Sequence, residues 1–528
     1  MRYNQHMEYR TIRELLEYRA TSTPDWVFGV HEDWEISCST LQACVNRLAN
    51  GLTEIGVTPR QHVAVMLGNH PDHIFTIFAI AELDAVWVPV NVNLRGPSLD
   101  YLFEKSAPHT VIVDSDFWDR LGPVLADKNA KTVIVRNASK LVSPSERMKV
   151  VDFSEVTRRE TAPPHTNPTL DEIRCISFTS GTTGEPKGVL LTERMLMTFS
   201  RGAAIASEVR TDDVFLLWEP LYHNSGVQMC ILALMEQVKL AIIPKFSASR
   251  FWDQIRKYRV TKMHYLGGVI DILLKSPAHP NDKDHSIQLA FGGGCSINGW
   301  KAFQDRFGVR IQEVYGLTEA SGFSTINKSG KIGSIGKAYP YFEVKIVDDE
   351  GKPLGPEQIG EIVIREKEPG LITQGYLENL ESTAKAFRGG WLYTGDLGCY
   401  DEEGDFYYKG RKKDSIRRRG ENISAWEVER VLNSHPKIEE SAVLGVDADV
   451  GEQELKAFIK CAAGSTLEPL EIIKWCESLL PYYQIPRYVT FVDFFEKTPT
   501  ERIRKESLPK ETTDCWDLEN SGYKIERR

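Results

Sequence analysis

An alternation of apolar, strand-like runs with helical patterns constrains the fold of this chain more than any other feature of its sequence. The alternating segments are residues 63–67, 74–83, 86–90 and 110–113, and later 214–217, 240–244, 251–258 and 262–266. Strands that are separated by helices form βαβ units around a parallel sheet. We therefore predict an α/β fold.

The pattern changes from Glu343 onward. Short strand-like runs are separated there by turns such as 349–351 and 401–404, which indicates a β-rich subdomain. After a basic run at 411–420, a helix, two strands and a helix are expected at 425–434, 441–446, 454–460 and 470–479. The 528 residues also exceed one ordinary core. We predict a large N-terminal domain (1–412) and a small α+β C-terminal domain (413–528), joined near Lys413.

The composition excludes several classes of protein. A net charge of −10 leaves no excess of Lys and Arg for general nucleic-acid binding. The nine cysteines form no C-x-x-C pair, which disfavours a zinc site and fits reduced thiols. We find neither an apolar core of signal-peptide length nor a membrane-spanning stretch. These features predict a soluble cytoplasmic protein.

A loop rich in hydroxyl groups and glycine follows the apolar run 173–178. This hydroxyl-glycine loop reads Thr179, Ser180, Gly181, Thr182, Thr183, Gly184, Glu185, Pro186, Lys187, Gly188. Backbone N–H groups, hydroxyls and an ammonium can all face one polyanion, so we predict a phosphate site. It is not a Walker A loop, because Pro186 occupies the position of the second glycine. The alternative is a flexible linker, which seldom ends in Pro-Lys-Gly before an apolar segment.

Two further polar turns supply what a nucleotide site needs. The turn at 315–319 offers the aromatic ring of Tyr315, a hydroxyl and the carboxylate of Glu319, and the turn at 391–396 adds Asp396. The basic residues Lys409 and Arg411 follow. An aromatic plane can stack on a base, a carboxylate can accept two ribose hydroxyls, and cations can hold phosphate.

Together these motifs resemble the adenylate-forming enzymes, which include acyl-CoA synthetases, luciferases and peptide-synthetase adenylation domains. The resemblance covers nearly the whole chain, with the motifs in the family's order: 88–91, the hydroxyl-glycine loop, 315–319, 391–396, Arg411 and 419–423. Residues 220–224 are similar to the acyl-pocket motif. The chain most resembles the branch with carnitine-CoA ligase and medium-chain acid ligases.

The resemblance implies a role for each matching residue. Thr179, Ser180, Gly181, Thr182, Thr183, Gly184 and Lys187 would hold the ATP phosphates, with Thr318 also on phosphate. Tyr315 and Gly316 would face adenine, with Gly293 and Gly294 on its other side. Asp396 and Arg411 would bind the ribose, Glu319 would reach Mg²⁺, and Gly420 and Glu421 would border the CoA channel. As isolated residues, Asp396 and Glu319 could instead cap turns, and Tyr315 could belong to the core.

The acyl group is less well specified. Tyr222, His223, Asn224, Gly267, Gly268, Val269, Gly292 and Gly322 match the family's pocket positions. The many glycines predict open volume and a bulky, largely apolar acid, although Gly268 and Gly292 could simply allow close strand contact. In the family, the residue matching His223 screens the pocket. The alternative for His223 is a satisfied core histidine.

Enzymes of this family use two half-reactions, and Lys413 matches the hinge about which the small domain turns between them. Carboxylate and ATP give acyl-AMP and pyrophosphate, and CoA then gives the thioester and AMP. The C-terminal motif departs from the family, because Arg502 replaces the lysine that bridges carboxylate and α-phosphate. A planar guanidinium on a longer arm places its donors differently from an ammonium. We therefore expect weak adenylation and retained thioester formation, with Arg502, His223, Lys187 and Lys413 as the catalytic set.

Several alternatives remain open. Arg502 could support adenylation adequately, which would make the chain a complete ATP-dependent ligase. A non-catalytic adenylate-binding protein, a carrier-protein-loading enzyme and a luciferase-like oxygenase share the same motifs. The expected ligands are a carboxylic acid or its acyl-adenylate, ATP, Mg²⁺ and CoA, and a separate adenylating enzyme could supply the adenylate. The sequence leaves the oligomeric state open, including a homodimer.

Overall fold

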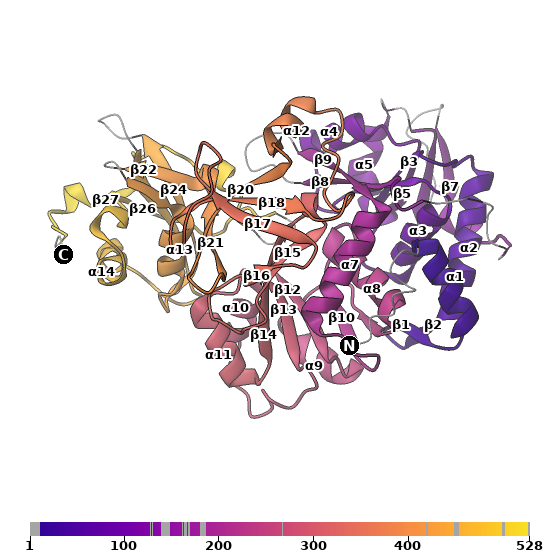
Figure 1. Ribbon diagram of the computed structural model, residues 1–528, viewed down its shortest axis with the longest axis horizontal. Coiled ribbons are helices and arrows are strands. Elements are labelled where there is room, and N and C mark those ends of the chain that lie inside the picture. The colour runs from indigo at the N-terminus through magenta and orange to yellow at the C-terminus, as the bar shows by residue number, and fades with distance from the viewer. Residues whose placement is uncertain are drawn as a thin grey trace.

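The computed structural model of the protein describes residues 11–126, 128, 130–138, 148–160, 162, 166, 169–179, 186–266, 268–418, 421–447, 453–498 and 502–525. Two large sheets, a smaller antiparallel sheet and a C-terminal α/β unit follow one another along the molecule (Figure 1). The predicted α/β class is confirmed. All nine cysteines fall within the described residues and are free thiols. No helix in these residues is long and apolar enough to cross a membrane.

The N-terminal sheet is parallel except for its last strand. Its order is β7 (Lys149–Asp152), β6 (Thr132–Arg136), β5 (Thr110–Asp114), β3 (His62–Met66), β4 (Val86–Pro89), β8 (Ile173–Thr179) and the antiparallel β9 (Lys187–Thr192). Its helices are α2 (Cys38–Glu54), α3 (Pro71–Glu82), α4 (Gly96–Ser106), α5 (Trp118–Leu125) and α6 (Phe153–Val156). Every residue of β5 is buried, as expected for a parallel strand covered on both faces.

The second sheet contains the predicted strands 214–217 and 262–266. Its order is β16 (Lys337–Ala338), β15 (Gly322–Ile326), β14 (Arg310–Leu317), β13 (Leu289–Gly293), β12 (Lys262–Leu266), β10 (Val214–Leu217), β11 (Lys239–Ile242), β1 (Val27–His31) and β2 (Trp34–Ser37). Its neighbouring helices include α9 (Phe251–Tyr258), α10 (Gly268–Lys275) and α11 (Ile297–Phe307). Helix α7 (Glu193–Ser207) contacts strands of both large sheets and also packs on α8 (Asn224–Glu236), which in turn contacts α1 (Ile12–Ser22).

The predicted β-rich subdomain is confirmed as an antiparallel sheet. It contains β17 (Phe342–Val347), β18 (Gly360–Glu366), β19 (Phe387–Arg388), β20 (Trp391–Tyr400) and β21 (Phe406–Arg411), with α12 (Leu380–Ala386) beside it. The expectation that Asp396 lies on a turn is wrong, because Asp396 is in the middle of β20. Tyr315 likewise lies within β14 and not on a turn, since β15 pairs with β14 as far as Leu317.

A separate unit forms the C-terminal end of the molecule (Figure 1). It begins with the hairpin β22 (Ser415–Arg418) and β23 (Glu421–Ser424), and continues with α13 (Ala425–Asn433), β24 (Ile438–Asp447), β25 (Gln453–Cys461), α14 (Pro469–Leu479), β26 (Tyr488–Phe491) and β27 (Trp516–Asp517). The predicted order of helix, two strands and helix is therefore confirmed. Its apolar core includes Ile423, Val428, Leu455 and Ile472.

Candidate nucleotide and acyl site

The Asp396 carboxylate is the centre of a buried polar cluster. Asp396 and Arg411 are cross-strand partners on β20 and β21, and Arg411 Nε lies 2.9 Å from Asp396 Oδ1. The Tyr315 hydroxyl donates to Asp396 Oδ2 at 2.7 Å. Burial raises the pKa of Asp396, and the charge of Arg411 and the Tyr315 hydrogen bond oppose this shift. The structure thus brings together three residues that the sequence predicted for adenine and ribose.

A second polar cluster lies where β9 leaves the hydroxyl-glycine loop. The Lys187 ammonium is 5.0 Å from the centre of the Tyr376 ring, and the Tyr376 hydroxyl donates to Glu319 Oε1 at 3.0 Å. Burial raises the pKa of Glu319, and the charges of Arg411 and Lys187 oppose this shift. Two backbone contacts hold the cluster together: Leu377 N donates to Gly188 O and Thr373 N to Glu319 O.

Glu319 is suited to Mg²⁺ only with help from a ligand. No group of three or more His, Cys, Asp or Glu side chains in the described parts of the chain could hold a metal ion. Mg²⁺ commonly binds through one or two carboxylates together with substrate phosphates. A single carboxylate near Lys187 fits that requirement.

The sequence analysis missed a buried carboxylate that supports the predicted adenine-facing glycines. Glu313 Oε1 accepts the backbone N–H of Gly294 at 2.5 Å and that of Cys295 at 3.2 Å, and the Tyr265 hydroxyl donates to Oε2. Burial raises the pKa of Glu313 to about 7. Glu313 therefore fixes the turn after β13. Only the sequence position of Glu313, two residues before Tyr315, could have drawn attention to it.

His223 caps α8 and is held in one orientation. Its Nδ1 accepts the Ser225 N–H at 3.1 Å and lies 2.6 Å from the Ser225 hydroxyl, so the neutral ring has its proton on Nε2. Burial lowers the pKa of His223 to about 4, and the nearby side chains of His264 and Arg502 add to this effect. The next residue, Asn224, donates from Nδ2 to Ser177 Oγ at 3.2 Å and is buried. His223 is therefore neutral at physiological pH.

The protein itself fills the space at two of the predicted acyl-site glycines. A Cβ atom on Gly322 would lie 2.3 Å from Phe199 Cδ1, and one on Gly292 would lie 1.9 Å from Tyr265 O. The expectation that these glycines leave open volume is wrong at both positions, and close strand contact explains Gly292. Val269 is buried in the core between the second sheet and its helices. Gly268, at the start of α10, is exposed.

Arg502 is close to Asp396 and His223 although it lies in the C-terminal unit. Its charge opposes the burial-driven rise in the pKa of Asp396 and of Tyr408, and it contributes to the low pKa of His223. Two hydrogen bonds to Thr498 hold its backbone: Thr498 N donates to Arg502 O at 2.7 Å, and Arg502 N donates to Thr498 Oγ1 at 3.1 Å. The C-terminal unit thus brings a guanidinium towards His223 and Asp396.

The lysines on either side of Arg502 are engaged elsewhere. Lys497 Nζ lies 2.5 Å from Glu440 Oε1, and Lys505 Nζ lies 2.6 Å from Glu429 Oε1. Both pairs are internal to the C-terminal unit. Lys413 lies 3.8 Å from Glu506, next to the segment that contains Arg502.

Some predicted site residues lie outside the described residues, namely Ser180, Gly181, Thr182, Thr183, Gly184, Gly267 and Gly420. Thr179 and Lys187, at the two ends of the hydroxyl-glycine loop, pair across β8 and β9. Thr318 begins a short 3₁₀ turn with Glu319, and Gly316 lies in β14. Tyr222 is half-buried beside His223, and the backbone of Glu421 belongs to β23.

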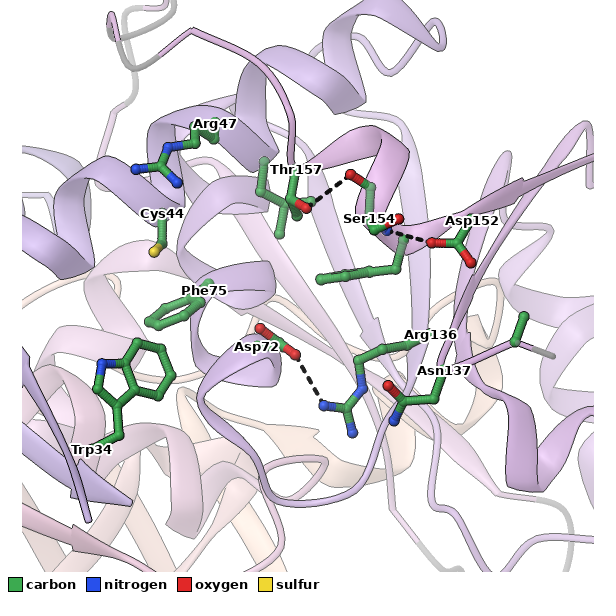
Figure 2. Close-up of a pocket in the computed structure, with 13 residues that line it drawn as sticks. Trp34, Cys44, Arg47, Asp72, Phe75, Arg136, Asn137, Asp152, Ser154 and Thr157 are labelled. Atoms are coloured by element: carbon green, nitrogen blue, oxygen red, sulfur yellow. Dashed lines mark hydrogen bonds and ion pairs between the residues drawn. The ribbon is translucent and has the colours of Figure 1, made fainter. Parts of the chain in front are cut away.

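A cavity of about 410 Å³ lies in the N-terminal sheet region, away from these clusters (Figure 2). Its lining includes Trp34, Phe75 and Arg136, and Arg136 pairs with Asp72 at 3.0 Å and with Asp114 at 2.6 Å. None of the predicted site residues lines it.

Comparison with known proteins identifies the class. The family model of the AMP-binding enzymes matches residues 16–377, and the model of the AMP-binding enzyme C-terminal domain matches residues 427–502. The first match alone covers more than half of the chain. The protein therefore belongs to the AMP-binding enzyme family, whose members are the adenylate-forming enzymes.

Individual relatives agree with this assignment. The crotonobetaine/carnitine-CoA ligase of Salmonella typhi is 30% identical over 482 residues, which cover 90% of this chain and 93% of that protein. The fold is similar to the anthranilate CoA ligase AuaEII in complex with anthranoyl-AMP, with a TM-score of 0.85, 24% identity and coverage of 94% and 96% of the two chains. It is also similar to O-succinylbenzoate CoA synthetase from Bacillus subtilis in complex with AMP, with a TM-score of 0.82, 24% identity and coverage of 94% and 97%.

Proposed function

We propose that this protein is an acyl-CoA ligase that forms a thioester from an acyl-adenylate and CoA, and that its adenylation half-reaction is slow. The single observation that supports the class most strongly is the buried cluster of Asp396, Arg411 and Tyr315. A carboxylate held between a guanidinium and a phenol can accept ribose hydroxyls beside an aromatic ring. The 30% identity to a CoA ligase over 90% of the chain supports the choice of thiol.

The two half-reactions require different groups from this chain. In the first, a substrate carboxylate oxygen attacks the α-phosphorus of ATP and pyrophosphate leaves. Lys187 and the hydroxyl-glycine loop would hold the phosphates, and Mg²⁺ at Glu319 would neutralise phosphate charge. In the second, the CoA thiolate attacks the acyl carbon and AMP leaves. Rotation of the small domain about Lys413 would carry Arg502 away from the active site after the first step. The same rotation would bring the CoA channel near Gly420 and Glu421 to the active site for the second step.

Arg502 is the reason to expect a slow first step. The motif lysine of the family would place a compact ammonium between carboxylate and α-phosphate, whereas a guanidinium is planar and longer. A misplacement of about 1 Å can cost about 100-fold in rate. Neither flanking lysine is available to compensate, because Lys497 is paired with Glu440 and Lys505 with Glu429.

A complete ATP-dependent ligase is the second candidate. The observation that favours it is the approach of Arg502 to His223 and Asp396, since the charge of Arg502 influences the pKa of both. The first candidate needs an external source of acyl-adenylate, such as a separate adenylating enzyme. The second candidate needs only the free acid, ATP and CoA.

Thioester formation measured by two routes separates these candidates. Purified protein is given CoA with either free acid plus ATP or the matching synthetic acyl-adenylate, across a few bulky and medium-chain acids. The proposal predicts product mainly from the adenylate. Similar rates by both routes would support the complete ligase. If neither route gave product, a non-catalytic adenylate-binding protein would be favoured.

A further inference from the structure

A buried pair of ionisable side chains lies next to the proposed acyl site and has no role in the mechanism above. His264 Nδ1 is 2.7 Å from Glu219 Oε1, and the two side chains are 2% and 0% exposed. The Trp218 N–H donates to Glu219 Oε2 at 3.2 Å, and Trp218 Nε1 donates to His264 O at 2.8 Å. The residues Trp218 and Glu219 therefore fix His264 at both its backbone and its ring.

Three contacts place His264 beside the predicted acyl positions. Its ring centre is 5.2 Å from that of Phe291, which precedes Gly292, and 6.0 Å from that of Phe323, which follows Gly322. His264 is also close enough to His223 to contribute to the low pKa of His223. The imidazole thus lies among residues from β12, β13, β15 and the start of α8.

The hydrogen bond to Glu219 determines what the other ring nitrogen can do. A carboxylate can only accept, so Nδ1 carries a hydrogen and Nε2 of the neutral ring has a free lone pair. No described residue makes a hydrogen bond to His264 Nε2, and its aromatic neighbours Phe291 and Phe323 offer no donor from their rings. A donor on a bound ligand would hydrogen-bond to this lone pair.

We propose that His264 determines substrate specificity by accepting, at Nε2, a hydrogen bond from a hydroxyl or N–H group on the acyl substrate. The inference rests on the proposed function, because it assumes that the acyl group lies between His223 and Phe323. It replaces the expectation of a largely apolar acid with an acid whose body is apolar or aromatic but which carries one hydrogen-bond donor. Glu219 is the positioning residue that holds the ring and its tautomer.

The alternative is that the pair only packs the interior. Replacing both partners of a buried hydrogen bond by apolar residues of similar shape can be nearly neutral or stabilising. The double variant Glu219→Met/His264→Phe is therefore the informative change, since neither side chain is left buried without its partner. His285→Phe is a matched control, because it removes a partly buried histidine that stacks on Trp252 and hydrogen-bonds Phe307.

The test measures the binding of stable acyl-sulfamoyl adenosines by calorimetry, together with AMP. The acyl groups are phenylacetyl rings that carry a hydroxyl, an amino or a methyl group at the ortho, meta or para position. We expect at least one hydroxyl or amino analogue to bind the natural protein about tenfold or more tightly than its methyl counterpart, because a site built around a hydrogen bond discriminates strongly against an analogue that lacks it. The double variant should lose this preference, and the His285→Phe variant should keep it.

Two results would overturn the inference. One is equal affinity of the natural protein for methyl and donor-bearing analogues at every ring position while AMP still binds. The other is a preference that survives in the double variant. Failure of AMP and all analogues to bind the natural protein would contradict the proposed function itself, and the AMP measurement thus separates the two failures. A preference for only the hydroxyl or only the amino series would support the inference and identify the donor.

Discussion

Replacement of Asp396 by asparagine should weaken nucleotide binding more than any change of similar size elsewhere in the β-rich subdomain. Asp396 is 2% exposed and interacts with Arg411 and Tyr315 at 2.9 and 2.7 Å. Loss of one partner of a buried pair costs about 3–5 kcal/mol. The Arg411 side chain is 31% exposed and can be hydrated, so we expect a stability loss of about 2–3 kcal/mol, below that range. If Asp396 also accepts the ribose hydroxyls, loss of its charge should weaken AMP binding about 10- to 150-fold, from about 1.5–3 kcal/mol per charged hydrogen bond.

The chain offers a close control for this change. Asp401 also pairs with a cation and a phenol, since Lys331 Nζ lies 2.5 Å and the Tyr407 hydroxyl 2.9 Å from its Oδ2. Asp401→Asn should lower stability without changing AMP affinity. Calorimetry gives the AMP Kd, and thermal unfolding gives the stability of each variant. The reasoning is refuted if Asp396→Asn binds AMP as the natural protein does, or if Asp401→Asn weakens AMP binding to the same extent.

Two further changes test the supports of the site. Gly316→Ala should prevent correct folding, because its Cβ would lie 1.6 Å from Gly322 O. The control Gly355→Ala, whose Cβ would have no atom within 4 Å, should leave the soluble yield and Tm unchanged. A normal soluble yield of Gly316→Ala would contradict the strand contact. Burial raises the pKa of Glu313 to about 7, against about 4.3 in an unfolded chain, so the folded state binds more protons between these values. The stabilising contribution of protonated Glu313 is then present below about pH 4.3 and is lost as pH rises to about 7, a change on the order of 3 kcal/mol. Glu313→Gln should flatten this part of the dependence of Tm on pH, and an unchanged dependence would argue against the shift.

The sequence predicted elements that repeat local patterns, and it failed where contacts depend on strand register. The helix at 251–258 and the strand at 262–266 match α9 and β12, because each has an unbroken apolar pattern. The sequence predicts Asp396 on a turn at 391–396, yet the cross-strand pairing with Arg411 keeps it in β20. The sequence pattern of one strand does not show which residue of the neighbouring strand lies opposite each of its residues.

The same limit applies to the buried polar pairs. Glu313 meets Tyr265, and Glu219 meets His264, across 48 and 45 residues of sequence respectively. Each pair links different strands or loops of one sheet, so only the assembled sheet brings the two side chains together. The motifs nevertheless included residues that the structure brings together, because the family resemblance supplied the long-range relation that local patterns lack. Tyr315, Asp396 and Arg411 form one cluster, and Lys187 and Glu319 meet around Tyr376.

The central claim is that Arg502 limits adenylation and not thioester formation. ATP–pyrophosphate exchange measured for the natural protein and for Arg502→Lys tests it most directly, with Arg504→Lys as the neighbouring control and thioester formation from synthetic acyl-adenylate measured in parallel. The account predicts that Arg502→Lys raises exchange by about 10- to 100-fold, changes the adenylate route less than about twofold, and that Arg504→Lys changes neither. Fast exchange in the natural protein, or no gain in Arg502→Lys, would contradict the account and indicate a complete ligase in which arginine serves as well as lysine.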